Sequence, residues 1–341
     1  MKTSDFFYDL PQELIAQTPI EPRDHSRMLV YDRSEKTISH KHFFDLPNYL
    51  RKGDVLVINE TKVIPARLLG EKEETHVPVE LLLLKRHEKD LWEALVRPGR
   101  RLMPGVFCSF GNGKLRAEIC SSTPEGGRMV RFHYDGVFEA ILDELGQMPL
   151  PPYIHEKLAD RTRYQTVYAK AEGSAAAPTA GLHFTPELLS KIKDMGIDIV
   201  PVVLHVGLGT FRPVKVDDVA SHQMHVEHYE VSEESARRIN QARANGGRCI
   251  CIGTTSVRTL ETATTADGIV HSGSGDTGIF LTPGSPFHAT NALVTNFHLP
   301  ESTLMMLVAA FMGYDETMRL YREAVEEKYR FFSFGDAMLV I

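Results

Sequence analysis

The sequence has few cysteines, and their spacing excludes the common cysteine-based sites. Its four cysteines are Cys108, Cys120, Cys249 and Cys251, and none belongs to a C-x-x-C pair. Neither a zinc ribbon nor a thioredoxin-like redox centre is therefore expected. Cys249 and Cys251 alternate along an apolar run, which is typical of cysteines that pack as small apolar residues in a buried strand. These features predict a reducing compartment.

The chain also lacks long apolar runs and an excess of positive charge. Its longest apolar stretch, Leu304 to Met312, is about half of the ~20 residues that a membrane-spanning helix needs. No apolar signal segment follows the N-terminal residues, so we expect a cytoplasmic protein. The formal net charge of −7 argues weakly against a nucleic-acid partner. An excess of basic residues between Arg97 and Arg131 leaves two interpretations open: a solvated face, or a patch that faces phosphates.

Two kinds of pattern divide the chain. Residues 63–151 show short strands around tight turns such as Gly111-Asn112-Gly113, with little helix, which predicts an inserted small antiparallel β-barrel domain. Residues 1–62 and 152–341 alternate strands with helices, which predicts a discontinuous large α/β domain whose mostly parallel sheet is flanked by helices. In the large domain we expect strands at 28–31, 55–58, 197–206, 248–252 and 292–295, and helices at 11–17, 186–195, 233–244, 257–263 and 303–312. In the small domain we expect strands at 79–85, 91–96, 106–110, 114–120 and 129–134, and a helix at 137–145.

One stretch, Gly173 to Thr185, consists mainly of small side chains and carries no formal charge. Such residues build neither a core nor a solvated face. They let a flat ligand lie close to the backbone, within reach of Ser174, Thr179 and His183. The following Thr185-Pro186-Glu187 has the pattern of a helix start. The alternative is a compact loop that only leads into this helix.

Three further segments follow predicted strands, where α/β proteins place their ligand sites. Gly253 to Arg258 puts free backbone N–H groups and two threonine hydroxyls at a helix start, which suits a carboxylate or a phosphate. It lacks the lysine and the spacing of a P-loop. His205 to Arg212 offers a histidine beside glycines that admit a ligand, and Asn296 to Pro300 carries His298. For each segment a purely structural role is the alternative.

Other motifs favour no particular chemistry. His222, His225 and His228 lie near Glu227, but residues three apart on a strand face opposite sides, so we predict no metal site. Gly273 to Gly278 matches G-x-G-x-x-G, yet strand-like residues follow it instead of a helix, so we expect a loop. The sequence has no G-x-S-x-G elbow, which disfavours an acyl hydrolase.

Ordered motifs run along nearly the whole chain. They are Leu10 to Gln17, Asp24 to Arg27, Thr61 to Arg67, Met148 to Pro152, Arg163 to Tyr168, Gly173 to Thr185, Leu204 to Val214, Gly253 to Thr259, Thr295 to Pro300 and Tyr329 to Met338. Together they closely resemble the S-adenosylmethionine:tRNA ribosyltransferase-isomerase family of queuosine biosynthesis. The resemblance is weakest in the middle of the inserted segment, residues 63–151, where only Val79 to Leu83 and Trp92 to Pro98 are similar.

The resemblance implies an activity as well as a two-domain fold. The ribosyl part of S-adenosylmethionine, a consumed substrate and not a true cofactor, is moved onto 7-aminomethyl-7-deazaguanine in the wobble position of a tRNA with a GUN anticodon. Adenine and methionine leave, and the product is epoxyqueuosine. In the mechanism usually drawn for the family, a base removes a proton beside the sulfonium and adenine departs. The tRNA amine then attacks, and epoxide closure expels methionine. The family also suggests a monomer.

These implications give a candidate site. We expect His183 or His205 as the general base and His298 as a second proton-transfer group. Thr254, Thr255 and Arg258 would hold the methionine carboxylate or an RNA phosphate. The other residues expected to bind substrate are Gly173, Ser174, Pro178, Thr179, Gly181, Gly207, Gly209, Arg212 and Asn296. The residues expected to contact tRNA are Arg97, Arg100, Arg101 and Arg116.

Two functions from other classes compete with this one. An S-adenosylmethionine-dependent RNA methyltransferase is disfavoured because the sequence lacks a convincing glycine-rich loop followed by a helix near its start. A non-catalytic RNA-binding protein predicts exposed aromatic residues between the basic ones of the barrel. Phe107, Phe110 and Phe132 are expected instead to pack inside the barrel.

Overall fold

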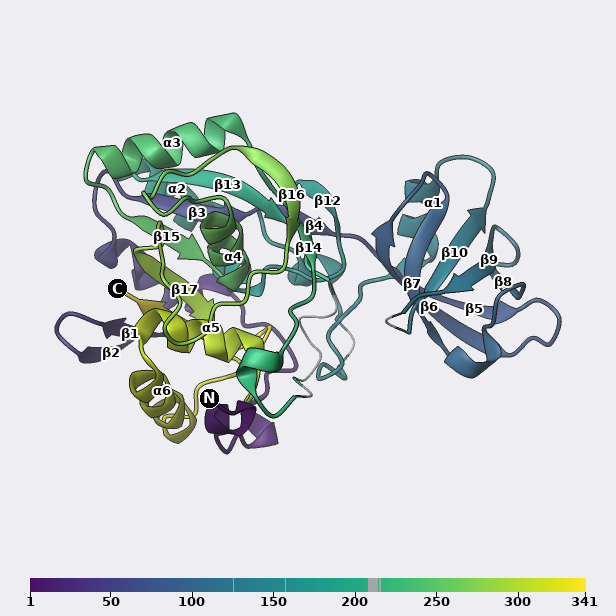
Figure 1. Cartoon of the computed structure of the whole chain (residues 1–341), viewed down its shortest axis with the longest axis horizontal. Helices are drawn as coiled ribbons and strands as arrows, with labels where there is room; N and C mark the ends of the chain where they lie inside the picture. The colour runs from purple at the N-terminus through teal and green to yellow at the C-terminus, as the bar shows by residue number, and fades with distance from the viewer. Residues whose placement is uncertain (125, 157, 208–213, 215) are drawn as a thin grey trace. The chain divides into compact units, whose positions relative to one another are not determined.

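The chain divides into two units, each with its own core (Figure 1). The structure is a computed structural model that describes residues 1–124, 126–156, 158–207, 214 and 216–341. Unit 1 comprises Met1–Thr61, Pro152–Ala171 and Ala177–Ile341, and unit 2 comprises Lys62–Pro151 and Glu172–Ala176. Two residues of the expected site, Gly209 and Arg212, lie outside the described residues.

Unit 1 is built on a nine-stranded mixed sheet. Across the sheet the order is β16 (Gly273–Thr277), β14 (Glu227–Val231), β13 (Asp198–Leu204), β3 (Val55–Asn59), β15 (Cys249–Ile252), β17 (Ala292–Asn296), β18 (Ala337–Val340), β1 (Arg27–Asp32) and β2 (Thr37–His42). The central strands β13, β3, β15 and β17 are mutually parallel, and β1 is parallel to β18. The other pairings are antiparallel. The predicted α/β class is confirmed, but the sheet is more mixed than expected because antiparallel partners flank its parallel centre.

Alternating side chains of the central strands supply two apolar cores, one on each face of the sheet. In β3, Val55 and Val57 belong to one core, whereas Leu56 and Ile58 belong to the other. Apolar residues of α3 (Glu233–Ala244), α4 (Thr254–Thr262), α5 (Thr303–Met312) and α6 (Tyr314–Glu326) complete the first core. Those of α2 (Pro186–Asp194) and the 3₁₀ helix η4 (Phe43–Tyr49) complete the second. Burial on both faces explains why these strands are continuous apolar runs.

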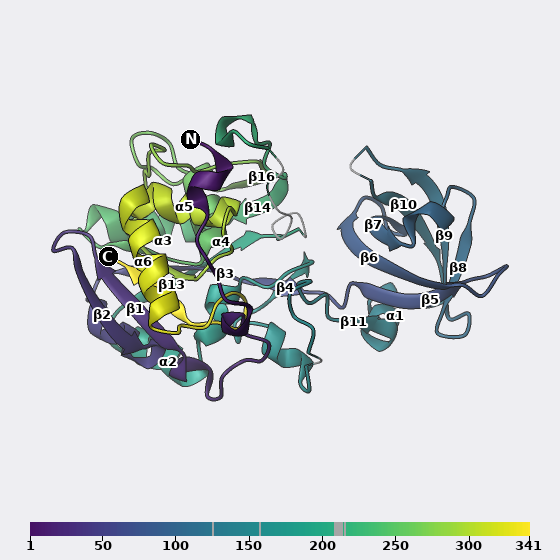
Figure 2. The same ribbon diagram turned by 90° about the horizontal axis from the view of Figure 1, so that it is seen from below.

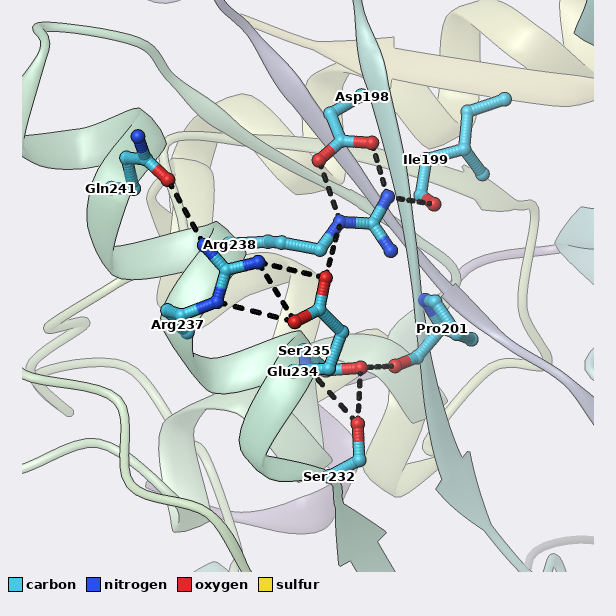
Figure 3. Close-up of polar contacts among 9 residues, drawn as sticks. All are labelled: Asp198, Ile199, Pro201, Ser232, Glu234, Ser235, Arg237, Arg238 and Gln241. Atoms are coloured by element: carbon cyan, nitrogen blue, oxygen red, sulfur yellow. Dashed lines mark hydrogen bonds and ion pairs between the residues drawn. The ribbon is translucent and has the colours of Figure 1, made fainter.

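The expected helix starts are confirmed by their capping bonds. The hydroxyl oxygens of Thr185 and Ser302 accept the backbone N–H of Leu188 and Met305, at 3.1 and 3.2 Å. Helix α3 is attached to β13 by side chains: the Arg238 guanidinium pairs with Asp198, and the Ser235 hydroxyl donates to the Pro201 carbonyl at 2.7 Å (Figure 3).

Unit 2 is a closed antiparallel barrel. Its ring runs β5 (Arg67–Lys72), β6 (Pro78–Arg86), β7 (Leu91–Arg97), β10 (Arg128–His133), β9 (Leu115–Ser122) and β8 (Phe107–Phe110), and β8 pairs back with β5. Helix α1 (Phe138–Leu145) lies beside β11 (Gly146–Gln147), which pairs with β5 (Figure 2). The core holds Trp92, Phe110 and Phe132, so the predicted small antiparallel barrel is confirmed.

Several elements differ from the expectation. Gly273 to Gly278 was expected as a loop, but Gly273–Thr277 forms β16. The backbone of this segment pairs with β14, and such pairing does not depend on the side chains. The segment 11–17, expected as a helix, contains only the 3₁₀ turn η2 (Gln12–Leu14). Among the elements that the sequence patterns missed are β2, β5, β11, β14, β18, α6 and the short pair β4 (Thr61–Val63) and β12 (Ala171–Ser174). Within the described ranges, no helix is long and apolar enough to cross a membrane.

Candidate active site

The candidate site of unit 1 lies where its parallel strands end. Because β13, β3, β15 and β17 run parallel, their carboxyl ends meet at one edge of the sheet. The residues that follow these ends are His205, Thr61, Gly253 and His298. The strand-end loops expected to carry the site are therefore brought together.

A pocket of about 690 Å³, counting its open mouth, lies at this edge. We call it the apolar pocket. Its lining residues are Tyr153, Ala177, Pro178, Thr179, Ala180, Val206, Gly253, Thr254, Thr255, Thr295, Asn296, Phe297, His298, Leu299, Ser302, Leu304, Phe332 and Ser333. They include Pro178, Thr179, Thr254, Thr255, Asn296 and His298 of the expected site. The lining combines apolar walls with a few polar groups, as the sites of small organic ligands do.

The N-terminus of α4 forms the polar end of the pocket wall. Gly253 precedes the helix with a φ of +87°, a backbone conformation that favours glycine, and its N–H donates to the Val294 carbonyl at 2.7 Å. The next backbone N–H groups, those of Thr254 and Thr255, stand at the free end of the helix. Within the described part of the chain, the buried Thr255 hydroxyl has no hydrogen-bond partner. These donors and the helix dipole favour an anionic group of a ligand.

His298 lines the apolar pocket as an uncharged imidazole. Its Nε2 lies 2.9 Å from the Thr295 hydroxyl, which itself donates to the Asn296 carbonyl at 3.3 Å. In a neutral imidazole one ring nitrogen carries the proton and the other a lone pair. The main chain of His298 is held by the hydroxyls of Tyr8 and Tyr321. Burial lowers the pKa of the imidazole to about 3, so the ring is neutral at physiological pH.

His183 is buried, and both of its ring nitrogens are engaged. Nδ1 lies 2.7 Å from the Ser26 hydroxyl, and Nε2 lies 3.0 Å from Oδ1 of Asn296. The Asn296 amide nitrogen donates to the Phe332 carbonyl at 2.8 Å, so its oxygen is the atom that faces His183 and the proton is on Nε2. Burial chiefly lowers the pKa of His183 to about 4. The ring lines a second pocket and not the apolar one, which it reaches only through Asn296.

His205 also lies outside the residues that line the apolar pocket. Its Nδ1 lies 3.0 Å from the Thr61 hydroxyl, and its ring stacks on His228 with centroids 6.2 Å apart. Burial, followed by the nearby His228, lowers its pKa. The structure thus brings one of the three expected catalytic histidines, His298, into direct contact with the pocket.

Arg258 has a partner inside the protein. Its side chain is 2% exposed, and its Nη1 pairs with the buried carboxylate of Glu227 on β14. The other Glu227 oxygen accepts the backbone N–H of Gly207 at 2.8 Å. Arg258 and Gly207 do not line the apolar pocket. The sequence predicted that Arg258 lies one turn into the helix. It did not predict the pairing with Glu227, because this contact joins residues 31 positions apart.

The small residues of Gly173 to Gly181 have different roles in the structure. Ala177 to Ala180 line the apolar pocket. Gly181 is needed for packing, because a Cβ there would lie 2.0 Å from the Tyr168 hydroxyl. Gly173 and Ser174 belong to β12, where the buried Ser174 hydroxyl donates to the Ala176 carbonyl at 2.7 Å. The expected ligand wall is therefore shorter than the motif.

Sequence reasoning gave no role to one wall of the apolar pocket. Tyr153, Phe332 and Ser333 form it: the two rings lie 4.7 Å apart, and the Tyr153 hydroxyl lies 2.7 Å from that of Ser333. Phe332 has a φ of +70°, which is uncommon for a residue with a side chain. The aromatic run Phe331-Phe332-Ser333-Phe334 was the one pattern that could have indicated this wall, but such a run is equally typical of a hydrophobic core.

The basic residues of the barrel fall into two groups. Arg116 makes a bidentate pair with Glu73, at 2.6 and 2.9 Å, and lies over the ring of Phe107, so its charge is already neutralised. Arg97, Arg100 and Arg101 are exposed. In the part of unit 2 that the structure describes, their side chains form neither a hydrogen bond nor an ion pair.

A search of the described residues for three or more histidine, cysteine, aspartate or glutamate side chains able to hold a metal ion finds no such group. His228 pairs with Asp276, and Glu227 is occupied by Arg258.

The fold and the site define a class: an α/β enzyme with a small-molecule pocket at the carboxyl ends of its parallel strands. Comparison with known proteins gives the family. Residues 3–340 match the family described as queuosine biosynthesis protein. The chain therefore belongs to the queuosine biosynthesis family, and the resemblance noted in the sequence is confirmed.

Individual relatives agree with this assignment. The chain is 60% identical, over 340 residues, to the S-adenosylmethionine:tRNA ribosyltransferase-isomerase of Clostridioides difficile, and 58% identical, over 341 residues, to that of Caldanaerobacter subterraneus subsp. tengcongensis. Both alignments cover 100% of each chain. The crystal structure of the S-adenosylmethionine tRNA ribosyltransferase of Thermotoga maritima is similar, with 39% identity and a TM-score of 0.57 over 99% of this chain and 100% of that one.

Proposed function

We propose that this chain is an S-adenosylmethionine:tRNA ribosyltransferase-isomerase. It transfers the ribosyl moiety of S-adenosylmethionine to 7-aminomethyl-7-deazaguanine in the tRNA wobble position, isomerises it to epoxyqueuosine, and releases adenine and methionine. The observation that carries this proposal is the apolar pocket, which joins a wall of small residues, a helix N-terminus and a neutral histidine. S-adenosylmethionine is the consumed substrate, and we propose no separate cofactor.

The N-terminus of α4 holds the methionine carboxylate. The carboxylate accepts the backbone N–H groups of Thr254 and Thr255 and the Thr255 hydroxyl, whose buried oxygen lacks a partner among the described residues. Arg258 does not contact the carboxylate. It pairs with Glu227, which also accepts the backbone N–H of Gly207, and so fixes α4 relative to Gly207. Arg258 is thus a positioning residue in this proposal and not a direct ligand.

The purine and the ribose lie between the small residues and the aromatic wall. Ala177, Pro178 and Ala180 leave room close to the backbone, while Phe332 offers a ring face. Thr179 and Asn296 are the polar groups of this part of the lining. Such a site recognises a nucleoside by shape and by a few hydrogen bonds.

His298 is the group that exchanges protons with the substrate. Removal of the proton beside the sulfonium needs a base in its unprotonated form, and the imidazole of His298 is neutral at physiological pH. His183 positions Asn296, and the carboxamide of Asn296 in turn faces the pocket. His205 holds Thr61 at the end of β3. We propose supporting roles for these two histidines.

The tRNA is recognised partly by unit 2. Arg97, Arg100 and Arg101 are exposed cations that neutralise backbone phosphates, whereas the bidentate pair with Glu73 removes Arg116 from this set. We further propose that the tRNA has a GUN anticodon and that the enzyme is a cytoplasmic monomer. In this proposal residues 1–62 and 152–341 are the catalytic domain, and residues 63–151 are an inserted tRNA-binding domain.

Two labelled forms of S-adenosylmethionine test the proposal against its main competitor. With label in the ribose, the tRNA becomes labelled; with label in the methyl group, the label stays with methionine. An RNA methyltransferase gives the opposite pattern. A non-catalytic RNA-binding protein transfers neither label, and the buried positions of Phe110 and Phe132 remove two aromatic residues that it would use to stack bases.

A further inference from the structure

A second pocket in unit 1 adjoins the apolar one. We call it the cationic pocket; it measures about 280 Å³ with its open mouth included, and its polar lining consists of Arg23, Ser26, Arg163, His183 and Ser333. Ser333 lines both pockets. A hydrogen-bonded chain also joins them, since Ser26 contacts His183 and His183 contacts Asn296 in the wall of the apolar pocket.

The two arginines of the pocket are half-buried, whereas the acids that act on them, Glu21 and Asp160, are exposed. Arg23 donates to the carbonyls of Thr162, Gln165 and Leu182, at 3.0, 2.9 and 3.3 Å. Carbonyl groups satisfy the N–H donors but leave the full charge of the guanidinium. Arg163 donates to the Ile20 carbonyl at 2.7 Å and pairs with Glu21, a carboxylate that is 69% exposed. An ion pair with such an exposed partner is weak, so a phosphate can replace Glu21.

Positive charges near the cationic pocket act on one another, and for Arg23 the acids Glu21 and Asp160 oppose this effect only in part. Burial and then the charge of Arg163 lower the pKa of Arg23, and the charges of Arg330 and Arg23 add to the effect of burial on His183. Asp336 is the buried acid of this region. Its oxygens accept the backbone N–H groups of Arg27 and Arg330, both at 2.8 Å, and burial raises its pKa. Like charges gathered around a small pocket are stabilised by an anion.

We propose that the cationic pocket binds one backbone phosphate of the tRNA, next to the nucleoside that reacts in the apolar pocket. The inference rests on the proposed function. The anionic group of S-adenosylmethionine is its carboxylate, for which the N-terminus of α4 supplies a site in the other pocket. The tRNA supplies one phosphate for every nucleotide, and guanidinium groups are well suited to bind it. A phosphate seated beside Ser333 fixes the attached nucleoside at the mouth of the apolar pocket.

Arg163→Gln tests the proposal, because it removes one charge without removing the carbonyl contacts of Arg23. The matched control is Arg161→Gln, which changes an exposed arginine of the same 3₁₀ helix, η6 (Arg161–Tyr164), outside the pocket. We expect Arg163→Gln to raise the KM for tRNA roughly tenfold to a hundredfold, with the KM for S-adenosylmethionine within about twofold. The slope of log KM for tRNA against log salt should fall by about one. Equal losses in the two variants, or a rise confined to S-adenosylmethionine, would overturn the proposal.

A substrate with one phosphate altered gives a second test that does not depend on the variant's stability. Anticodon stem-loops carrying the modified base receive a neutral methylphosphonate at one position at a time around the wobble nucleotide. We expect one position to lower kcat/KM strongly in the wild-type enzyme and to have little further effect in Arg163→Gln. Additive losses at every position would show that Arg163 contacts no single phosphate.

The proposed function and this inference fail in different ways. Release of adenine by the wild-type enzyme with the unaltered stem-loop establishes the reaction whatever the cationic pocket binds. If that release occurs and the phosphate scan shows no coupling to Arg163, the inference alone is wrong.

Discussion

At the scale of single residues, the site depends on histidines that burial keeps neutral. His183 and His298 both have depressed pKa values, about 4 and about 3, because a charged imidazole loses its hydration when buried. Their hydrogen bonds separate their roles. Both nitrogens of His183 contact Ser26 and Asn296, whereas His298 contacts Thr295 through Nε2 and lines the apolar pocket. A neutral imidazole is the form of histidine that can accept a proton from a bound substrate.

Replacement of His298 should affect the chemical step. We expect His298→Asn to lower kcat by roughly a hundredfold or more, with a much smaller change in the KM for either substrate. Steady-state kinetics, with far-ultraviolet circular dichroism to verify folding, measures this. His222→Asn is the control, because His222 is a half-buried histidine that packs on Phe280 away from the pocket lining. Near-normal turnover by a folded His298→Asn enzyme would exclude His298 as the base.

Burial of His183 also predicts how stability depends on pH. The folded protein holds this imidazole neutral down to a pKa of about 4, whereas the unfolded chain has the ordinary value of 6.5. Unfolding therefore takes up a proton between these values. The contribution of neutral His183 to the free energy of unfolding is therefore fully present above pH 6.5. It is lost as the pH falls toward 4, and the loss over that range is roughly 1–3 kcal/mol. The free energy of unfolding in urea, at pH 7 and pH 5, should fall less in His183→Gln than in the wild type; equal falls would contradict the prediction.

At the scale of secondary-structure elements, the N-terminus of α4 is the feature that the sequence predicted best. Gly253 to Arg258 contains the positive-φ glycine and the hydroxyls that a helix start beside a ligand requires, and these signals are local. The helix starts at Pro186 and Thr303 were predicted for the same reason. The pattern placed the helix start a few residues late, at Val257, because the apolar period begins there, whereas α4 begins at Thr254.

The Thr255 hydroxyl tests the role of this helix start. Thr255→Val keeps the shape of the side chain but removes the donor, and we expect the KM for S-adenosylmethionine to rise about tenfold or more, because a hydrogen bond to a carboxylate is lost. The KM for tRNA should stay nearly constant. Isothermal titration with S-adenosylmethionine alone provides a direct measurement. Thr265→Val, an exposed position beyond the end of α4, is the control. Unchanged affinity in Thr255→Val would place the carboxylate elsewhere.

Features that depend on tertiary contacts escaped sequence analysis. Tyr153 and Ser333 are in contact in the pocket wall although 180 residues separate them. The sequence around each residue contains no pattern that predicts this contact. The pairing of Arg258 with Glu227 is similar: local spacing presented Arg258 as a free ligand, and only the fold supplies its partner. β16 was missed because its glycines and Asp276 have little tendency to form strands, and pairing with β14 overrides that tendency.

In the barrel, a buried arginine supports the turn that carries the free arginines. Arg128 donates to the carbonyls of Leu102 at 2.7 Å, Gly99 at 2.9 Å and Gly127 at 2.9 Å, and so holds the 3₁₀ helix η5 (Gly99–Arg101). We expect Arg128→Met to weaken tRNA binding several-fold, because Arg100 and Arg101 lose their fixed position, and to leave the KM for S-adenosylmethionine unchanged. Arg131→Met removes a half-buried arginine of the same strand and serves as the control. Filter binding at two salt concentrations measures the effect; equal affinities of Arg128→Met and wild type would rule out this support.

At the scale of the whole molecule, the net charge is negative although some regions are locally positive. The chain has a formal net charge of −7, yet Arg97, Arg100 and Arg101 of unit 2 and the cationic pocket of unit 1 carry local positive charge. The net charge alone argued against a nucleic-acid partner. Local pairing separates the basic residues: Glu73 neutralises Arg116, whereas the described part of unit 2 offers no ion-pair partner to the side chains of Arg97, Arg100 and Arg101. Which basic residues are free is a tertiary property, and the sequence could not separate them.

The measurement that tests the whole account most directly is the set of small products. The protein is incubated with S-adenosylmethionine and a tRNA that carries 7-aminomethyl-7-deazaguanine, and the filtrate is separated by chromatography. The account predicts adenine and methionine in equal amounts, formed only with that tRNA and lost in His298→Asn. S-adenosylhomocysteine in place of adenine and methionine would identify a methyltransferase and contradict the central claim.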